Sequence, residues 1–356
     1  MKKSFYLFCI FLLIISLMSC GNKTSAQKIR VAGLIRSDSE TFLNAYKAAL
    51  VKSAEENDAD LQVYFCNSDD AVQLDQVKNL LTNGVTYFVI IPVDTGLTEQ
   101  IVRLIHSKGG AVAFSNILPS DAALDVDKNA FYVSSAETAA GDFQAQILDD
   151  YFKKNPGKLS GKTVRILYLN GEVGHSAQIF RRQGFMDGLA KRGYAIDIVA
   201  EGSANWGLAT ARQLTDNWIK GNAKFDAIIA QNDDMALGAV ESLIAHGRTD
   251  IPGDASTDAD RDGTALAVPV IGVDATEVAK ASIANHKLYA TVLQDAAGQA
   301  TTALEVVVQC ARHGNAKGFA TKAGIKALDE VTQEAPATRK SVLDQCFMAP
   351  FVPVTE

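Results

Sequence analysis

Cysteine and strongly basic segments are scarce in this sequence. Only three of the five cysteines, Cys66, Cys310 and Cys346, follow residue 20, and an odd number predicts no closed disulfide framework. The sequence leaves open whether Cys310 and Cys346 pair, whereas Cys66 lies in an apolar run and is expected in the core. The formal net charge of −7 and the lack of a basic patch or arm argue against a nucleic-acid partner.

Long apolar runs and familiar catalytic motifs are missing as well. Beyond the N-terminal segment, no stretch of about eighteen apolar residues is available to span a bilayer. No H-E-x-x-H pair of histidines and no G-x-S-x-G nucleophile turn occurs. We therefore expect a protein that is not an enzyme and that requires no cofactor.

The N-terminal segment carries signals for export and anchoring. A short positive start precedes an apolar run from Phe5 to Leu17, which has the length of a signal-peptide core and is shorter than a membrane span of ~20 residues. The run ends in LMSC, which resembles a bacterial lipobox with Cys20 as the lipidated residue. We expect a lipoprotein signal peptide over 1–19 and a polar tether over 20–27, placing the chain on the periplasmic face of a bacterial membrane. An ordinary signal peptide that happens to contain a cysteine is the alternative.

Short β-branched runs alternate with amphipathic stretches through the rest of the chain. Strands are expected at 28–35, 61–66, 87–91, 111–114, 130–133, 164–169, 196–199, 227–230, 268–273 and 289–293. Helices are expected at 40–57, 70–83, 95–108, 176–192, 208–220, 233–246, 275–286 and 296–312. This alternation is typical of a doubly wound parallel sheet, and it restarts once along the chain.

The length of the chain favours two such units, because it exceeds what one hydrophobic core usually supports. The sequence predicts an α/β fold of two doubly wound parallel-sheet lobes, joined by crossover strands around a ligand cleft. The N-terminal lobe is expected over 28–134 plus 295–347. The C-terminal lobe is expected over 135–294 plus 348–356.

Polar and aromatic side chains follow the predicted strands, at the edge where parallel sheets bind ligands. Nine of them are candidate ligand-binding residues: Asp38, Phe42, Asn116, His175, Arg181, Trp206, Asn232, Asp274 and Gln294. A carboxylate accepts two O–H bonds and an amide both donates and accepts, so these side chains suit neighbouring hydroxyl groups. Aromatic rings suit the C–H face of a sugar or the plane of a base. The set indicates binding of a small polar ligand.

Five segments carry a resemblance to a known family: Gly171 to His175 with Arg181, Asn205-Trp206, 229–241, 271–275 and 291–296. From about Ile29 to Leu304 the chain resembles the type I periplasmic sugar-binding proteins of ABC transporters, most closely their galactose/glucose branch. The resemblance implies ligand hydrogen bonds from Asp38, Asn116, His175, Arg181, Asn232 and Asp274, and ring stacking by Phe42 and Trp206. It implies a receptor that captures glucose or galactose and delivers it to an ABC permease in the inner membrane.

Three positions depart from the family pattern. Ala177 stands where an acidic residue is usual, Gln294 where Asn is usual, and Ile117 where Lys is usual. Because one hydroxyl acceptor is lost, another sugar or a purine nucleoside stays open as the ligand. The resemblance also implies closure of the lobes about crossover strands near Ser134, Gln294 and Met348.

Other functional classes stay open beside the transport receptor. A sensor that feeds chemotaxis or a kinase would use the same fold and ligand. The carboxylates Asp38 and Asp274 resemble an acid–base pair, which keeps an exported sugar-processing enzyme open.

Phe42 is as consistent with a core position as with stacking. Asp233 and Asp234 are interpreted as caps of the helix that follows them.

One acidic segment fits part of a calcium loop. Asp258, Asp260 and Asp262 alternate before a glycine, as in the first half of such a loop. Position twelve is Pro269 instead of Glu, so a solvated acidic insertion is the alternative to a calcium site. The tail over 316–346 is expected to add a helix pair to the first lobe.

Overall fold

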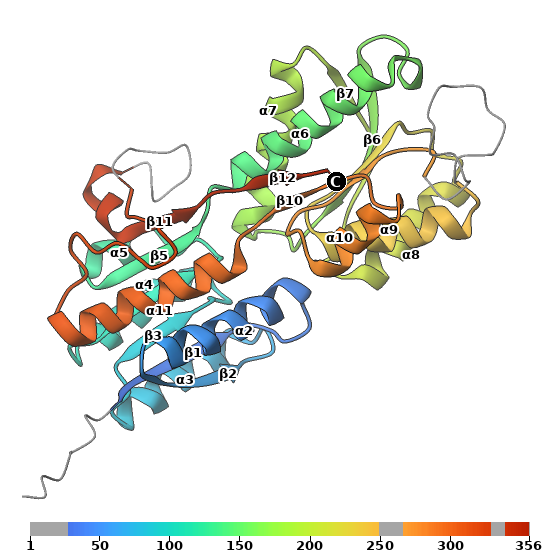
Figure 1. The fold of residues 1–356 in the computed structure, drawn as a ribbon. Coiled ribbons are helices and arrows are strands. Elements are labelled where there is room, and N and C mark those ends of the chain that lie inside the picture. Colours follow the sequence, from blue (N-terminus) through green and yellow to red (C-terminus); the bar gives the residue numbers. More distant parts are fainter. Residues whose placement is uncertain (1–27, 249–265, 329–338, 356) are drawn as a thin grey trace, which may run out of the picture.

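The computed structural model describes residues 28–248, 266–328 and 339–355. Outside these ranges lie the predicted signal peptide and tether with Cys20, and the predicted calcium ligands Asp258, Asp260 and Asp262. The described chain forms two α/β lobes that lie end to end (Figure 1). None of the helices in these ranges is long and apolar enough to cross a membrane.

The N-terminal lobe is built on a six-stranded sheet in the order β11-β5-β4-β3-β1-β2, and all of its strand pairs are parallel. Its strands are β1 (Ile29–Ile35), β2 (Ala59–Phe65), β3 (Tyr87–Ile90), β4 (Ala111–Ser115), β5 (Ala130–Ser135) and β11 (Cys346–Ala349). Its α-helices are α2 (Thr41–Glu56), α3 (Asp70–Thr82), α4 (Thr98–His106), α5 (Ala123–Val126) and α11 (Ala296–His313). Helices α2 and α11 bury one face of the sheet, and α3, α4 and α5 bury the other. The central strands β3 and β4 are therefore nearly all apolar.

The C-terminal lobe repeats this plan on a smaller parallel sheet in the order β7-β6-β8-β9. Its strands are β6 (Thr163–Asn170), β7 (Ala195–Ser203), β8 (Ala227–Ala230) and β9 (Val270–Ile271). Its α-helices are α6 (Glu137–Lys154), α7 (Ser176–Lys191), α8 (Leu208–Lys220), α9 (Asp233–Ala245) and α10 (Glu277–Ala284). Helices α6 and α7 cover one face, and α8, α9 and α10 cover the other.

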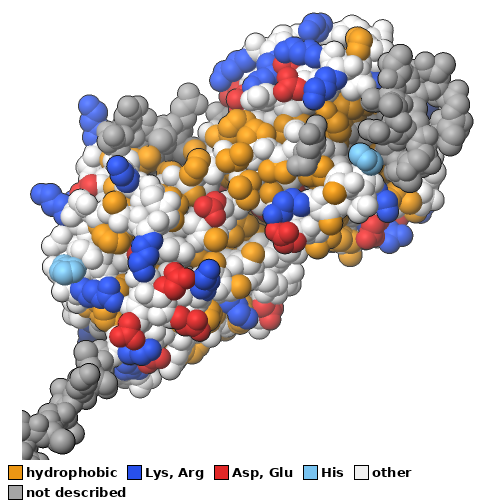
Figure 2. All heavy atoms as spheres, viewed as in Figure 1, with side chains coloured by type: hydrophobic (Ala, Val, Ile, Leu, Met, Phe, Trp, Pro, Cys, Tyr) orange, Lys and Arg blue, Asp and Glu red, His pale blue; other side chains and the backbone are white. Residues whose placement is uncertain are grey.

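The chain passes between the lobes three times. It leaves β5 for α6, leaves β10 (Thr291–Leu293) for α11, and leaves β11 for β12 (Val352–Val354), which pairs antiparallel with β10. On the face in Figure 2, apolar side chains gather where β10 and β12 run, and charged side chains spread over both lobes. The hydrophobic clusters of the two lobes share no residue. The two-lobed parallel α/β fold predicted from the sequence is thus confirmed.

The hydrophobic pattern of the sequence does not predict α6. The buried face of this helix includes Glu137 and Gly141 instead of a continuous apolar stripe. A Cβ atom at Gly141 would lie 2.1 Å from the carbonyl oxygen of Arg181, and one at Gly184 would lie 2.0 Å from that of Thr138. Helices α6 and α7 therefore pack with their backbones in contact, and such an interface requires small residues where a helical pattern normally has large ones.

The tail over 316–346 does not form the expected helix pair in its described part. It consists of turns followed by the short 3-10 helix η3 (Lys340–Gln345), which leads into β11. Gly318 and Gly324 have φ angles of 69° and 75°, which interrupt any helix. The tail instead delivers the edge strand of the N-terminal sheet.

The three cysteines of the described chain are buried and free. Cys66 lies next to the end of β1, where its thiol contacts the carbonyl oxygen of Arg36 at 3.7 Å. Burial raises the pKa of Cys310 and of Cys346 to about 12, so neither thiol ionises at neutral pH. In the structure Cys310 and Cys346 are not bonded to each other, and they belong to two different hydrophobic clusters of the N-terminal lobe.

Candidate ligand-binding site

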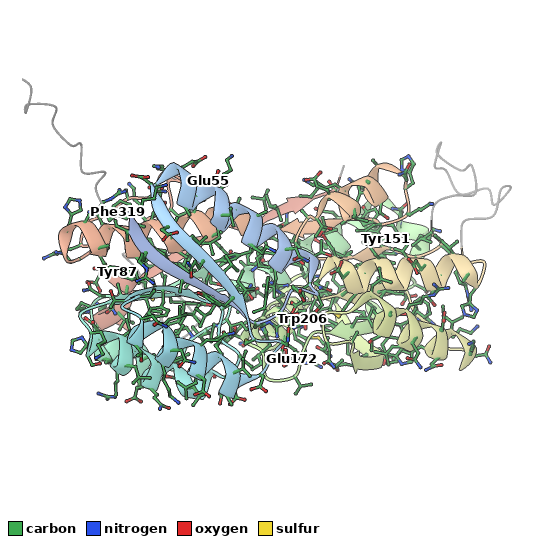
Figure 3. The ribbon with its side chains drawn as sticks, turned by 90° about the horizontal axis from the view of Figure 1, so that it is seen from below. Glu55, Tyr87, Tyr151, Glu172, Trp206 and Phe319 are labelled. Atoms are coloured by element: carbon green, nitrogen blue, oxygen red, sulfur yellow. The ribbon has the colours of Figure 1, made fainter. Side chains whose placement is uncertain are left out.

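A small pocket lies between the two lobes, among residues that follow strands of both sheets. Its walls are formed by Glu40, Phe42, Asn116, His175, Ala177, Arg181, Trp206, Asn232, Asp274 and Gln294. Figure 3 shows Trp206 and Glu172 in the middle of the molecule, where the lobes meet. The structure thus brings together all the candidate residues except Asp38.

A second hollow lies at the opposite edge of the C-terminal sheet. Arg165 at the start of β6 and Phe225 and Val268, which precede β8 and β9, line it. It contains none of the candidate residues, and ligands of parallel sheets bind at the other edge. Among the described residues, no group of three or more His, Cys, Asp or Glu side chains is placed to hold a metal ion.

The loop after β1 presents Glu40 to the cavity in place of Asp38. Asp38 is exposed, and its carbonyl oxygen accepts a hydrogen bond from Nδ2 of Asn44 at 2.9 Å. Glu40 lines the cavity, and its Oε1 accepts from Nη2 of Arg36 at 2.5 Å. Burial raises the pKa of Glu40, although Arg36 opposes this.

Arg181 is held by a buried network on the C-terminal lobe. Its Nε donates to Oε2 of Glu137 at 2.6 Å, and its Nη2 donates to Oε1 of Gln294 at 2.9 Å. Its Nη1 donates to the carbonyl oxygen of Gln231. These bonds use three of the five guanidinium N–H groups, which leaves two as donors. Because Glu137 belongs to α6, which the sequence pattern does not reveal, this partner is missing from the candidate residues.

The hydrogen bond that His175 accepts at Nδ1 shows which of its ring nitrogens can donate to a ligand. It is the N-cap of α7, and its Nδ1 accepts a hydrogen bond from the backbone N–H of Ala177 at 3.1 Å. Burial, and then the charges of Arg36 and Arg181, lower the pKa of His175 well below its usual value. A neutral ring that accepts at Nδ1 carries its proton on Nε2, so Nε2–H is the donor that remains.

Trp206 is fixed in an unusual backbone conformation. Its φ is 64°, and its ring lies against Gly171, where an added Cβ would be 2.1 Å from the ring. The ring contacts the edge of His175 with centroids 4.9 Å apart. Asn232 holds the loop, because its Nδ2 donates to the carbonyl oxygen of Trp206 at 3.1 Å. Such strained positions cluster at ligand sites, where the surrounding structure enforces them.

The helix cap of α9 comes from Asn232, so the interpretation of the two following aspartates as caps is wrong. The Oδ1 atom of Asn232 accepts from the N–H of Met235 at 3.0 Å. Asp233 instead accepts from the N–H of Thr276 at 2.7 Å and from Oγ1 of Thr291 at 2.5 Å. Asp233 thereby fixes the loop after β9, which carries Asp274.

Asp274, Asn116 and the indole N–H of Trp206 are polar groups of the cavity wall that have no side-chain hydrogen-bond partner among the described residues. Asp274 is 8% exposed and Asn116 6%, and no side-chain hydrogen bond is formed by either among the described residues. Both have positive φ, 121° and 63°. Burial raises the pKa of Asp274 well above its usual value, and Arg181 only partly opposes this. Buried polar groups normally find hydrogen-bond partners, so one acceptor and one amide, from opposite lobes, are available to a ligand.

Comparison with known proteins places the chain in a family. A family profile described as a periplasmic binding protein domain matches residues 31–316. A putative rhizopine-binding protein of Rhizobium meliloti is 33% identical over 254 residues, which are 71% of this chain and 74% of that protein. The chain therefore belongs to the periplasmic binding protein family.

Two further relatives extend the comparison. The D-galactose/methyl-galactoside binding periplasmic protein of Haemophilus influenzae is 28% identical over 240 residues, 66% of this chain and 67% of that protein. An ABC transporter solute binding protein from Bacillus halodurans C-125, solved with bound myo-inositol, has a TM-score of 0.71 and 25% identity and covers 93% of this chain and 96% of its own. The resemblance to sugar-binding proteins that the sequence indicated is confirmed.

Proposed function

We propose that the protein is a periplasmic receptor that closes on one polyhydroxylated ring and delivers it to an ABC permease. The observation that carries this is the pair of buried, unpartnered groups, Asp274 and Asn116, on opposite walls of one cavity. Arg181 and the neutral His175 add N–H donors. Acceptors and donors on both sides suit a ring whose hydroxyl groups both donate and accept.

Glucose or galactose is the ligand that the sequence resemblance favours, and the galactose-binding relative supports it. Trp206 and Phe42, both largely buried and from opposite lobes, supply apolar walls for the C–H faces of such a ring. A cyclitol is a second candidate, supported by the related structure with myo-inositol. Ala177 also supports it, since this cavity lacks one carboxylate expected of the galactose/glucose branch.

The remaining parts of the proposal concern anchoring and turnover. A lipid at Cys20 would keep the receptor at the membrane, and mass spectrometry of the mature N-terminus tests this. The relatives are binding proteins, which supports the absence of catalysis. Recovery of the bound ligand intact and in stoichiometric amount after hours of incubation is the expected result.

Tryptophan fluorescence tests the ligand directly, because Trp206 lines the cavity and Trp218 does not. D-galactose, D-glucose, myo-inositol, D-ribose and a panel of nucleosides are titrated into the protein, and calorimetry gives the affinity. We expect a saturable change with a six-membered polyol that is lost in Trp206→Phe and retained in Trp218→Phe. Asp274→Asn should weaken binding by roughly tenfold or more, since it removes hydrogen bonds to a charged acceptor.

Each other outcome has a defined meaning. If only a nucleoside gives a saturable response, the protein is still a receptor, but its ligand is not a polyol ring. No response to any compound by either method would refute the proposed function. A fluorescence response that survives Trp206→Phe would place the ligand outside this cavity.

A further inference from the structure

Polar contacts between described residues join the two lobes around the cavity. The pairs are Arg36 with Glu172 at 2.6 Å, Thr41 with Asp234 at 2.8 Å, and Leu118 with Ser176 at 3.2 Å. None of these residues lines the cavity, yet each lies within four residues of one that does. The lobes are therefore joined at the rim of the cavity, as expected of a closed form.

Arg36 differs from the other crossing residues because it also reaches the cavity wall. Its Nη1 donates to Oε2 of Glu172 on the opposite lobe, and its Nη2 donates to Oε1 of Glu40 on its own lobe. Arg36 is 4% exposed, and Glu40 lines the cavity. One planar guanidinium thus holds two carboxylates at once, an arrangement for which arginine is suited and lysine is not.

The two ends of this bridge differ in their exposure to water. The side chain of Glu40 is 20% exposed, whereas that of Glu172 is 50% exposed. Separating Glu172 from Arg36 therefore returns a half-solvated carboxylate to water, which costs little, while Arg36 keeps Glu40 as a partner. Such a contact biases the lobes toward closure without locking them, and a receptor that must release its ligand needs this balance.

We propose that Arg36 is a positioning residue that couples closure of the lobes to the placement of Glu40 in the binding site, with Glu172 as the contact that is made and broken. The effect on the ligand rests on the function proposed above, whereas the effect on closure does not. When the lobes open, Glu172 leaves and the Arg36–Glu40 pair is free to reorient. When they close, both carboxylates fix the guanidinium plane and hence the Glu40 carboxylate.

The test compares Glu172→Gln with a matched variant of the same lobe, Glu201→Gln. Glu201 pairs with Arg182 at 2.7 Å, but both residues belong to the C-terminal lobe and neither lines the cavity. Stopped-flow fluorescence measures the rate of ligand dissociation, and X-ray scattering measures the radius of gyration with and without ligand. In Glu172→Gln we expect dissociation up to about fivefold faster, an unchanged association rate and a larger ligand-free radius of gyration.

Three further readouts separate this coupling from a general structural effect. Glu172→Asp should recover part of the wild-type dissociation rate, and Glu201→Gln should leave it unchanged. Salt should speed dissociation from the wild type but not from Glu172→Gln, because salt screens a half-exposed ion pair. The effects of Glu40→Gln and Glu172→Gln on affinity should not add in the double variant, since both act through Arg36.

The outcomes distinguish this proposal from the function it builds on. If no polyol binds, the proposed function fails, while the ligand-free radius of gyration still decides whether Glu172 favours closure. Equal radii for the wild type and Glu172→Gln, together with equal dissociation rates for any ligand that binds, would overturn the coupling. Strictly additive effects in the double variant would overturn the role of Arg36 in placing Glu40.

Discussion

At the scale of single residues, the folded loops after the strands fix the backbone conformation of several cavity residues. Residue types at the ends of predicted strands identify Asn116, Trp206 and Asp274, but their positive φ angles come from the folded loops. Asp38 and Glu40 are two acidic residues of one loop. Their distance from β1 does not reveal which side chain turns inward, so the loop conformation decides it.

The titration of Asp274 should make ligand affinity depend on pH. Burial raises its pKa well above the usual value in the ligand-free protein, so part of the population is protonated at pH values where an ordinary Asp is ionised. Hydroxyl groups that donate to the carboxylate favour its ionised form. Ligand binding then releases a proton, and affinity increases as pH rises toward and through the raised pKa.

Calorimetry from about pH 5 to about pH 9 measures this effect, with a slope of at most about tenfold per pH unit for one proton. Asp274→Asn should weaken binding and flatten the slope. Glu40 also faces the cavity with a raised pKa, so Glu40→Gln is the matched variant that should retain most of the slope. His175 stays neutral because its pKa is lowered. An affinity that falls with rising pH would contradict this account.

At the scale of helices and strands, the sequence predicts the elements whose buried residues follow the normal hydrophobic period of a helix or a strand. The helix over 208–220 and the strand over 227–230 have the predicted bounds. The sequence pattern does not predict helix α6, because this helix contacts α7 through small residues. Their role is visible only when the partner helix is in place. The loss of α6 from the prediction also hid Glu137, the main ionic partner of Arg181.

Gly184→Ala should therefore destabilise the protein strongly. An added Cβ would lie 2.0 Å from the carbonyl oxygen of Thr138, and backbone atoms cannot yield as a flexible side chain does. We expect the free energy of unfolding to fall by about 2 kcal/mol or more, measured by urea denaturation. Gly157→Ala is the matched change, since nothing lies within 4 Å of its added Cβ. Equal stability of the two variants would refute close packing of α6 on α7.

At the scale of the whole molecule, separate cores and three connections favour motion of the lobes as bodies. No residue belongs to hydrophobic clusters of both lobes, so opening the cleft disrupts neither core. The crossings fall next to Ser134, Gln294 and Met348, where the sequence places the hinge. Closure then depends on the contacts at the cavity and its rim. Hinge motion itself stays a prediction.

The charged side chains around the cleft predict which ligands bind weakly to the closed form. Arg181 is paired with Glu137, and Arg36 is shared by two carboxylates, which leaves Asp274 without a cation of its own. A net negative charge on the molecule adds to this local excess. An anionic ring should therefore be repelled where a neutral ring of the same shape is accepted.

We expect D-galacturonate to bind at least about tenfold more weakly than D-galactose at about pH 9, where more of the Asp274 population is ionised than at neutral pH, because a second carboxylate in this poorly solvated cavity then meets like charge. Competition against a fluorescent response to the neutral ligand measures the ratio, and the acid form of any other neutral ligand serves equally. Asp274→Asn should weaken binding of the neutral sugar but bring the affinities for the acid and the neutral sugar closer together. Glu201→Gln, on the outer surface, should leave the ratio of the two affinities unchanged. Equal affinity for the acid and its neutral parent would mean that a proton or a cation neutralises the cavity in solution, and the unpaired Asp274 would then no longer account for ligand selection.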